Sequence, residues 1–151
     1  MTEIREGEPI QILLVEDSAG DVRLTQEAFK DAKVHLDIHV VSDGVEAMEF
    51  LARTNGFAGK PRPDLILLDL NLPRKDGREV LAEIKANPSL RSIPVVVLST
   101  SSDAEDIEGS YLLHANCYIP KPVDMDGFLS VVKGIDDFWL TGVKLLKGKS
   151  S

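Results

Sequence analysis

The sequence lacks the features that mark several classes of protein. Cys117 is the only cysteine in 151 residues, so one chain can build neither a disulfide framework nor a zinc cluster, and a buried, inert thiol is expected. No apolar run approaches the roughly 20 residues that span a bilayer, and the first residues lack the apolar core of a signal peptide. We therefore expect a cytoplasmic protein with no membrane partner.

Basic residues are also in short supply. The chain has 17 Lys and Arg against 25 Asp and Glu, for a formal net charge of -8 at pH 7. Domains that bind nucleic acid through its phosphates usually carry a basic face, so nucleic acid is not an expected partner. Hydrophobic residues make up 43% of the chain, enough for one sizeable core. We expect a single domain over residues 1–151, with a core of about 10–140 between a short N-terminal arm and a C-terminal tail, and no output domain.

Five short apolar runs alternate with longer segments of helical character. The runs cover residues 11–17, 36–43, 64–70, 93–100 and 116–119. This repeat of strand and helix predicts an α/β fold. The nearly unbroken Ile, Leu and Val of the third and fourth runs are typical of strands that helices cover on both faces. The sequence therefore predicts a parallel five-stranded sheet between two layers of helices.

Helix starts and helix faces can be predicted as well. A capping residue stands three positions before an acid at Ser18, Asp43, Asp76 and Ser102, and Asp124 resembles a fifth cap. Apolar residues at helical spacing behind the first three caps are expected to face the core, namely Val22 and Phe29, then Val45, Met48 and Ala52, then Val80, Leu81 and Ile84. Residues 53–63, rich in Gly and Pro, are expected to form a loop.

Polar side chains follow the strands at one end. Glu16 and Asp17 end the first strand, Asp69 nears the end of the third, Ser99 ends the fourth and Lys121 follows the fifth. Ligands of open α/β sheets bind at this carboxyl edge. Where the first and third strands are neighbours, the three acids converge and repel one another unless a cation neutralises them. A donor set made only of oxygen suits Mg²⁺, which leaves positions for phosphate oxygens.

Taken one at a time, these residues have simpler interpretations. An acid after a strand often caps a helix, a serine at a strand end often bonds to backbone, and a lysine in a loop is usually solvated. Independent caps would not place three acids, a hydroxyl and an ammonium at one edge of a sheet. The combination predicts a site for a phosphoryl group.

Four motifs carry a resemblance to a known family. They are VED (15–17), LLDLNLP (67–73), VLSTS (97–101) and YIPKP (118–122). With them the chain resembles the receiver domains of two-component response regulators, such as the chemotaxis receiver, over roughly residues 10–140. The resemblance implies a doubly wound, flavodoxin-like (βα)5 fold with the strand order 2-1-3-4-5.

The same resemblance implies a role for each acid. Asp69 is the expected phosphoacceptor. Asp17 and Asp69 are expected to bind Mg²⁺ directly, Glu16 through water, and the backbone carbonyl of Asn71 completes the protein ligands. Mn²⁺ and Ca²⁺ are expected substitutes for Mg²⁺.

Lys121 and the Ser99 hydroxyl are expected to neutralise the phosphoryl oxygens during transfer. Ser99 and Tyr118 match the family's switch pair, through which phosphorylation changes protein contacts. Thr100 stands where the family commonly has Ala or Gly, so the family's phosphoryl lifetime does not carry over to this chain. We expect no turnover of a separate substrate, only assistance by the domain to its own phosphorylation and dephosphorylation.

Two other functions also fit an aspartate at the end of a strand in a parallel sheet. A haloacid-dehalogenase-type phosphatase also uses an aspartate nucleophile and Mg²⁺, but it needs a second acid at the place of Asn71, which cannot shuttle a proton. A degenerate receiver that serves only as a binding module usually lacks an acid, the acceptor or the lysine, and all are present here.

The expected partner is a histidine kinase. Residues 53–63, 71–85 and 135–140 resemble stand-alone receivers that partner phytochrome-type histidine kinases. The apolar content of residues 127–146 exceeds what one buried helix face needs, which predicts a homodimer through this segment.

Overall fold

Strands and helices alternate along the chain, as the apolar runs predict. The computed structural model describes residues 9–30, 36–99, 117–120 and 126. The helices predicted behind Ser102 and Asp124 lie outside these residues. In chain order the elements are β1 (Ile10–Val15), α1 (Ala19–Phe29), β2 (Leu36–Val41), α2 (Gly44–Ala52), β3 (Leu65–Asp69), α3 (Gly77–Ala86), β4 (Val95–Ser99) and β5 (Cys117–Pro120).

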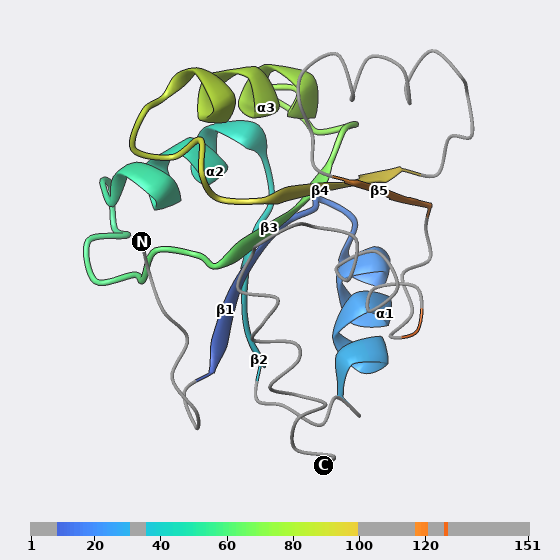
Figure 1. Cartoon of the computed structure of the whole chain (residues 1–151). Helices are drawn as coiled ribbons and strands as arrows, with labels where there is room; N and C mark the ends of the chain where they lie inside the picture. Colours follow the sequence, from blue (N-terminus) through green and yellow to red (C-terminus); the bar gives the residue numbers. More distant parts are fainter. Residues whose placement is uncertain (1–8, 31–35, 100–116, 121–125, 127–151) are drawn as a thin grey trace.

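The strands form one parallel sheet in the order β2-β1-β3-β4-β5 (Figure 1). This confirms the predicted flavodoxin-like topology. Val15 of β1 pairs with Leu68 of β3, and Asp69 of β3 pairs with Leu98 of β4. Because parallel strands end at the same edge, the residues that follow β1 and β3 begin side by side.

Helices cover both faces of this sheet. Helices α2 and α3 lie on one face and α1 on the other (Figure 1). Within β1, Leu13 and Val15 belong to the core under α2 and α3, whereas Ile12 and Leu14 belong to the core under α1. Full burial of such a side chain contributes roughly 1.5–3 kcal/mol. An apolar strand that is buried on both faces is therefore firmly fixed in position, which gives the loops at its end a rigid base.

Three predicted helix caps are confirmed. The Ser18 hydroxyl accepts the Asp21 N–H at 3.2 Å, and the Asp43 carboxylate accepts the Glu46 N–H at 2.8 Å. Asp76 forms a capping box with Glu79 at the start of α3. These side chains satisfy backbone donors that the first turn of a helix leaves without a partner.

The predicted core face of α2 is wrong in part. Ala52 is exposed and Val45 and Met48 are only half-buried, whereas Ala47, Phe50 and Leu51 are buried. The ring of Phe50 lies between those of His39 and Phe57, with centroids 5.6 and 5.5 Å away. An aromatic side chain buries far more area than alanine, so its position decides which side of this nine-residue helix faces the core.

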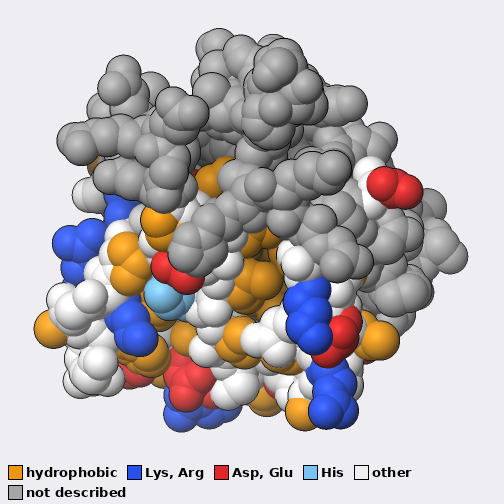
Figure 2. All heavy atoms as spheres, turned by 90° about the horizontal axis from the view of Figure 1, so that it is seen from below, with side chains coloured by type: hydrophobic (Ala, Val, Ile, Leu, Met, Phe, Trp, Pro, Cys, Tyr) orange, Lys and Arg blue, Asp and Glu red, His pale blue; other side chains and the backbone are white. Residues whose placement is uncertain are grey.

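The described surface is mixed in character. Seen from below, charged side chains of both signs are scattered among apolar and other polar groups (Figure 2). Leu24 of α1 and Val40 of β2 are the large hydrophobic side chains that stand exposed among the described residues. No helix within the described part of the chain is long and apolar enough to cross a membrane.

Two glycines lie where backbone segments touch. A Cβ on Gly77, the first residue of α3, would lie 2.3 Å from the Asp69 carbonyl oxygen and 2.6 Å from Leu70 Cα. A Cβ on Gly44, the first residue of α2, would lie 2.1 Å from the Lys75 carbonyl oxygen. Both clashes are with backbone, which cannot rotate away as a side chain does. The loop between β3 and α3 is therefore packed at each end against a glycine.

We predict that Gly77→Ala lowers the free energy of unfolding by about 1–3 kcal/mol, because the added methyl overpacks this backbone contact. Gly20→Ala is the matched control in the first turn of α1, where the new Cβ would meet only the Ser18 hydroxyl, at 3.9 Å. That control should gain about 0.5–1 kcal/mol, the usual advantage of alanine over glycine in a helix. Urea unfolding measures both values, and equal effects of the two substitutions would contradict the prediction.

Candidate metal centre

Three acids meet at the carboxyl edge of the sheet. Glu16 and Asp17 follow β1 directly and Asp69 is the last residue of β3. Because Val15 pairs with Leu68, the next residue on each strand faces the other across the two strand ends. One carboxylate oxygen from each acid lies within 4.8 Å of the other two. The predicted convergence of Glu16, Asp17 and Asp69 is thus confirmed.

The three acids differ in exposure and support. Glu16 and Asp69 are buried, with 2% and 4% of their surface exposed, whereas Asp17 is exposed. The Ser18 N–H donates to Glu16 Oε2 at 3.1 Å, and the Asn71 N–H donates to Asp69 Oδ1 at 3.1 Å. Each buried carboxylate therefore accepts a backbone hydrogen bond from the loop that follows its own strand.

Such a cluster is electrostatically unfavourable by itself. At the separation of these oxygens, two buried charges repel by on the order of 3 kcal/mol for an effective dielectric constant of about 20. A divalent cation removes this repulsion, and a donor set made only of oxygen is what hard cations such as Mg²⁺ prefer. The residues present therefore fit a divalent metal site.

A hollow opens beside the acids. It has a volume of about 350 Å³, and Glu16 and Asp17 form part of its lining together with residues of α1 and of the end of β2. Arg23 and Gln26 from α1 and Ser42 after β2 supply further polar groups to its wall. The hollow thus reaches Glu16 and Asp17 from the side of α1 and β2.

The remaining predicted site residues are placed only in part. Ser99 ends β4 and pairs with Pro120 of β5, so its backbone lies one step beyond Leu98, the partner of Asp69. The backbone of Tyr118 pairs with Val97 on the same two strands. Lys121 and Thr100 lie outside the described residues.

An ion pair near the site escaped the sequence analysis. Arg74, in the loop after β3, donates from Nε to Asp43 Oδ2 at 2.9 Å and from an Nη to Oδ1 at 3.3 Å. Burial by itself raises the pKa of Asp43, but the hydrogen bond from the Glu46 N–H and the Arg74 guanidinium outweigh it and hold the pKa below its usual value. The sequence identified Asp43 only as a cap, because no local spacing links two residues 31 positions apart.

A family model for the response regulator receiver domain matches residues 12–133. The chain is a response regulator receiver domain. Response regulator Rcp1 of Synechocystis sp. is 52% identical over 137 residues, which cover 91% of this chain and 93% of that protein.

Two solved structures resemble this receiver domain in both sequence and fold. The phosphorylated cyanobacterial phytochrome response regulator RcpA is 53% identical with a TM-score of 0.75, covering 89% of this chain and 96% of that one. The Mn²⁺-bound form of response regulator Rcp1 is also 53% identical, with a TM-score of 0.73 and coverage of 87% and 95%.

Membership in this family implies a general function for the chain. Receiver domains of response regulators are phosphorylated on an aspartate, bind a divalent metal and have a histidine kinase as partner. They are signalling domains and do not form an enzyme family. The cluster of Glu16, Asp17 and Asp69 is compatible with the divalent metal that such domains bind.

We predict that Mg²⁺ stabilises the domain, by about 2.7 kcal/mol at about 100 times its dissociation constant. Asp17→Asn should lose most of this gain. The metal-free variant should be slightly more stable than the metal-free wild type, because one repelling charge is gone. Thermal unfolding with and without Mg²⁺ measures both effects.

Glu27→Gln is the matched control for charge. Glu27 lies on α1 and pairs with Lys30 on the exposed surface, at 3.3 Å. This variant loses the same charge outside the cluster and should keep the full gain from Mg²⁺. If Mg²⁺ stabilised Asp17→Asn as much as it stabilises the wild type, the acids would be shown not to hold the metal.

Proposed function

We propose that this receiver accepts a phosphoryl group from a histidine kinase onto Asp69 in a Mg²⁺-dependent phosphorelay. Asp17, Asp69 and the Asn71 carbonyl bind Mg²⁺ directly, and Glu16 binds it through water. The observation that carries the proposal is the convergence of three carboxylates within 4.8 Å at the carboxyl edge of the sheet. The donor chemistry favours Mg²⁺, with Mn²⁺ and Ca²⁺ as substitutes.

The position of Asp69 in the sheet favours this residue over Glu16 and Asp17 as the phosphoryl acceptor. Asp69 ends β3, which has β1 on one side and β4 on the other, so groups that follow both neighbours can surround its carboxylate. Glu16 accepts the Ser18 N–H at the start of α1. Asp17 is exposed at the rim of the cluster.

The transfer itself is a displacement at phosphorus. A carboxylate oxygen of Asp69 attacks the phosphorus of a phosphohistidine, the P–N bond breaks, and the imidazole nitrogen leaves with the electron pair and takes up a proton. The product is an acyl phosphate on Asp69. The Lys121 ammonium and the Ser99 hydroxyl neutralise charge on the phosphoryl oxygens, and a cation held by Asp17, Asp69 and the Asn71 carbonyl would add to that neutralisation. The Asp69 carboxylate is buried and accepts a hydrogen bond from the Asn71 N–H, and both features orient this nucleophile before the phosphoryl donor arrives.

Output passes through the strands next to the acceptor. The new phosphoryl group adds roughly -1.5 to -2 charge, which draws the Ser99 hydroxyl inward and lets Tyr118 rotate. The pairing of Val97 with Tyr118 and of Ser99 with Pro120, which ties β5 to β4, supports this coupling. The surface that changes is an interface for other proteins.

The partner is a phytochrome-type histidine kinase. RcpA, 53% identical to this chain, is a cyanobacterial phytochrome response regulator, which supports the partner that residues 53–63, 71–85 and 135–140 predict. The likeness of nearly the whole chain to response regulators supports one receiver domain over residues 1–151, acting in the cytoplasm.

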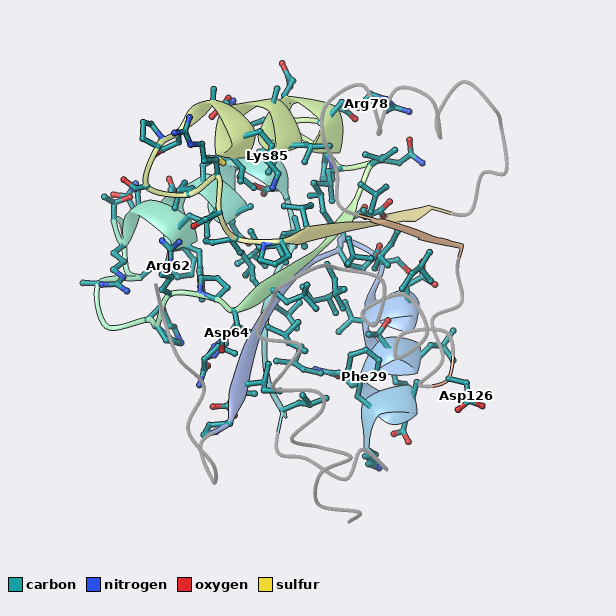
Figure 3. All side chains as sticks on the ribbon, viewed as in Figure 1. Phe29, Arg62, Asp64, Arg78, Lys85 and Asp126 are labelled. Atoms are coloured by element: carbon teal, nitrogen blue, oxygen red, sulfur yellow. The ribbon has the colours of Figure 1, made fainter. Side chains whose placement is uncertain are left out.

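We predict that Asp69→Asn abolishes labelling by a phosphorylated kinase or by acetyl phosphate with Mg²⁺, because the amide lacks the nucleophilic oxygen charge. Asp64→Asn is the matched control. Asp64 precedes the other end of β3 and accepts the Gln11 N–H at 2.8 Å, far from Arg78 in the first turn of α3 (Figure 3). Radiolabelling should show no product for the first variant and nearly normal product for the second.

Undiminished label on Asp69→Asn would refute the assignment. The phosphatase alternative makes a different prediction, namely steady release of inorganic phosphate from small phosphate esters. We expect no such turnover, because Asn71 stands where that mechanism needs an acid.

The homodimer through residues 127–146 stays a prediction, since this segment lies outside the described residues. Its support is the apolar content of the sequence. Sedimentation of the full chain should show dimers at tens of micromolar, and a version ending after Asp137 should be monomeric. If both sediment as monomers with and without a phosphate mimic, the dimer is ruled out.

A further inference from the structure

The loop between β3 and α3 is part of the acceptor site. It runs over residues 70–76, and its Asn71 N–H donates to Asp69 Oδ1 at 3.1 Å. At its end, the Gly77 N–H donates to the Leu70 carbonyl at 3.0 Å, which closes the loop on itself. A shift of the loop therefore moves a hydrogen-bond donor of the acceptor carboxylate.

Arg74 ties the middle of this loop to α2. Its guanidinium forms two hydrogen bonds with the Asp43 carboxylate, at 2.9 and 3.3 Å. The Asp43 side chain is only 12% exposed, against 56% for Arg74. A two-point, charge-assisted contact to a largely buried acid is stronger and better oriented than an ion pair between two exposed side chains.

The backbone at Arg74 adopts an uncommon conformation. Its φ is 64°, in the left-handed region. A residue with a Cβ adopts that region only at a steric cost, because the Cβ crowds the following carbonyl oxygen. The ion pair with Asp43 offsets this cost and selects the loop conformation.

Asp43 is itself a fixed point. Its carboxylate caps α2 by accepting the Glu46 N–H at 2.8 Å. Gly44, the next residue, lies so close to the Lys75 carbonyl that a Cβ there would be 2.1 Å from it. The start of α2 therefore holds the loop both through a side chain and through a backbone contact.

We propose that the Asp43–Arg74 ion pair positions the β3–α3 loop, and with it Asn71, for metal binding and phosphoryl acceptance at Asp69. This inference rests on the proposed function. Asp43 and Arg74 are positioning residues, because they act through the loop.

The test measures Mn²⁺ and Mg²⁺ affinity of the full chain by calorimetry in two variants. Asp43→Ser keeps a capping oxygen for α2 but is too short to reach Arg74. Arg74→Gly removes the guanidinium and relieves the strain of its positive φ. Supporting residues around a metal usually affect affinity by 10-fold or more, and for this more distant pair we expect each variant to weaken binding roughly 3- to 10-fold. The double variant should bind metal no more weakly than the single variant with the lower affinity, because the two residues act as one unit.

Two further variants separate positioning from general stability. Arg53→Gly is the matched control, since Arg53 has a φ of 60° at the end of α2 and no role in the loop. It should leave metal affinity unchanged. Arg74→Lys keeps the charge and should restore part of the affinity that Arg74→Gly loses. A residue that only supports folding would lower the urea midpoint without changing metal affinity of the folded protein.

Metal affinities of Asp43→Ser and Arg74→Gly within about two-fold of wild type would overturn the proposal. The Mg²⁺ concentration for half-maximal labelling by acetyl phosphate should rise in both variants by the same factor as the dissociation constant. A wild-type protein that binds Mn²⁺ but takes no label on Asp69 would instead refute the proposed function, and the affinity comparison would still test the ion pair.

Discussion

The rest of the site depends on the repulsion among Glu16, Asp17 and Asp69. Their carboxylate oxygens lie within 4.8 Å of one another, and two of the three residues are buried. Charges so placed repel strongly, and a cation relieves that repulsion. A cation held there would also neutralise the oxygens of a phosphoryl group, so the repulsion that favours metal binding would also serve the proposed phosphoryl acceptance. A domain can hold such a cluster only if the structure beneath it is stable without the contribution of the acids.

That stability comes from strands whose side chains are buried on both faces. Alternate residues of β1 and β3 enter two separate cores, one under α2 and α3 and one under α1. The polar residues begin where these strands end, so the hydrophobic cores and the charged site do not share side chains. Parallel pairing then brings the strand ends to one edge, where backbone donors from Ser18 and Asn71 hold the two buried carboxylates. The geometry of the site is thus set by short loops on a rigid base.

The sequence predicted most of this arrangement. The apolar runs and their composition predict the bounds of each strand to within about two residues. The spacing between a capping residue and a later acid predicts the helix caps at Ser18, Asp43 and Asp76. The convergence of the acids followed from strand order, which the family motifs supplied. The face of α2 was partly missed because Val45, Met48 and Ala52 fit a helical period as well as Ala47 and Leu51 do, and packing of Phe50 decides between them. The Asp43–Arg74 pair was missed because a contact between distant residues leaves no periodic signal.

That pair also solves an electrostatic problem of the loop. Arg74 is three positions after Asn71, and a cation there is attracted by the same acids that attract the metal. Asp43 accepts hydrogen bonds from Nε and one Nη along one edge of the guanidinium and holds its charge toward α2. A lysine, with one rotating ammonium, would be less firmly directed. The ion pair thus gives the positive charge of Arg74 a fixed partner at the start of α2.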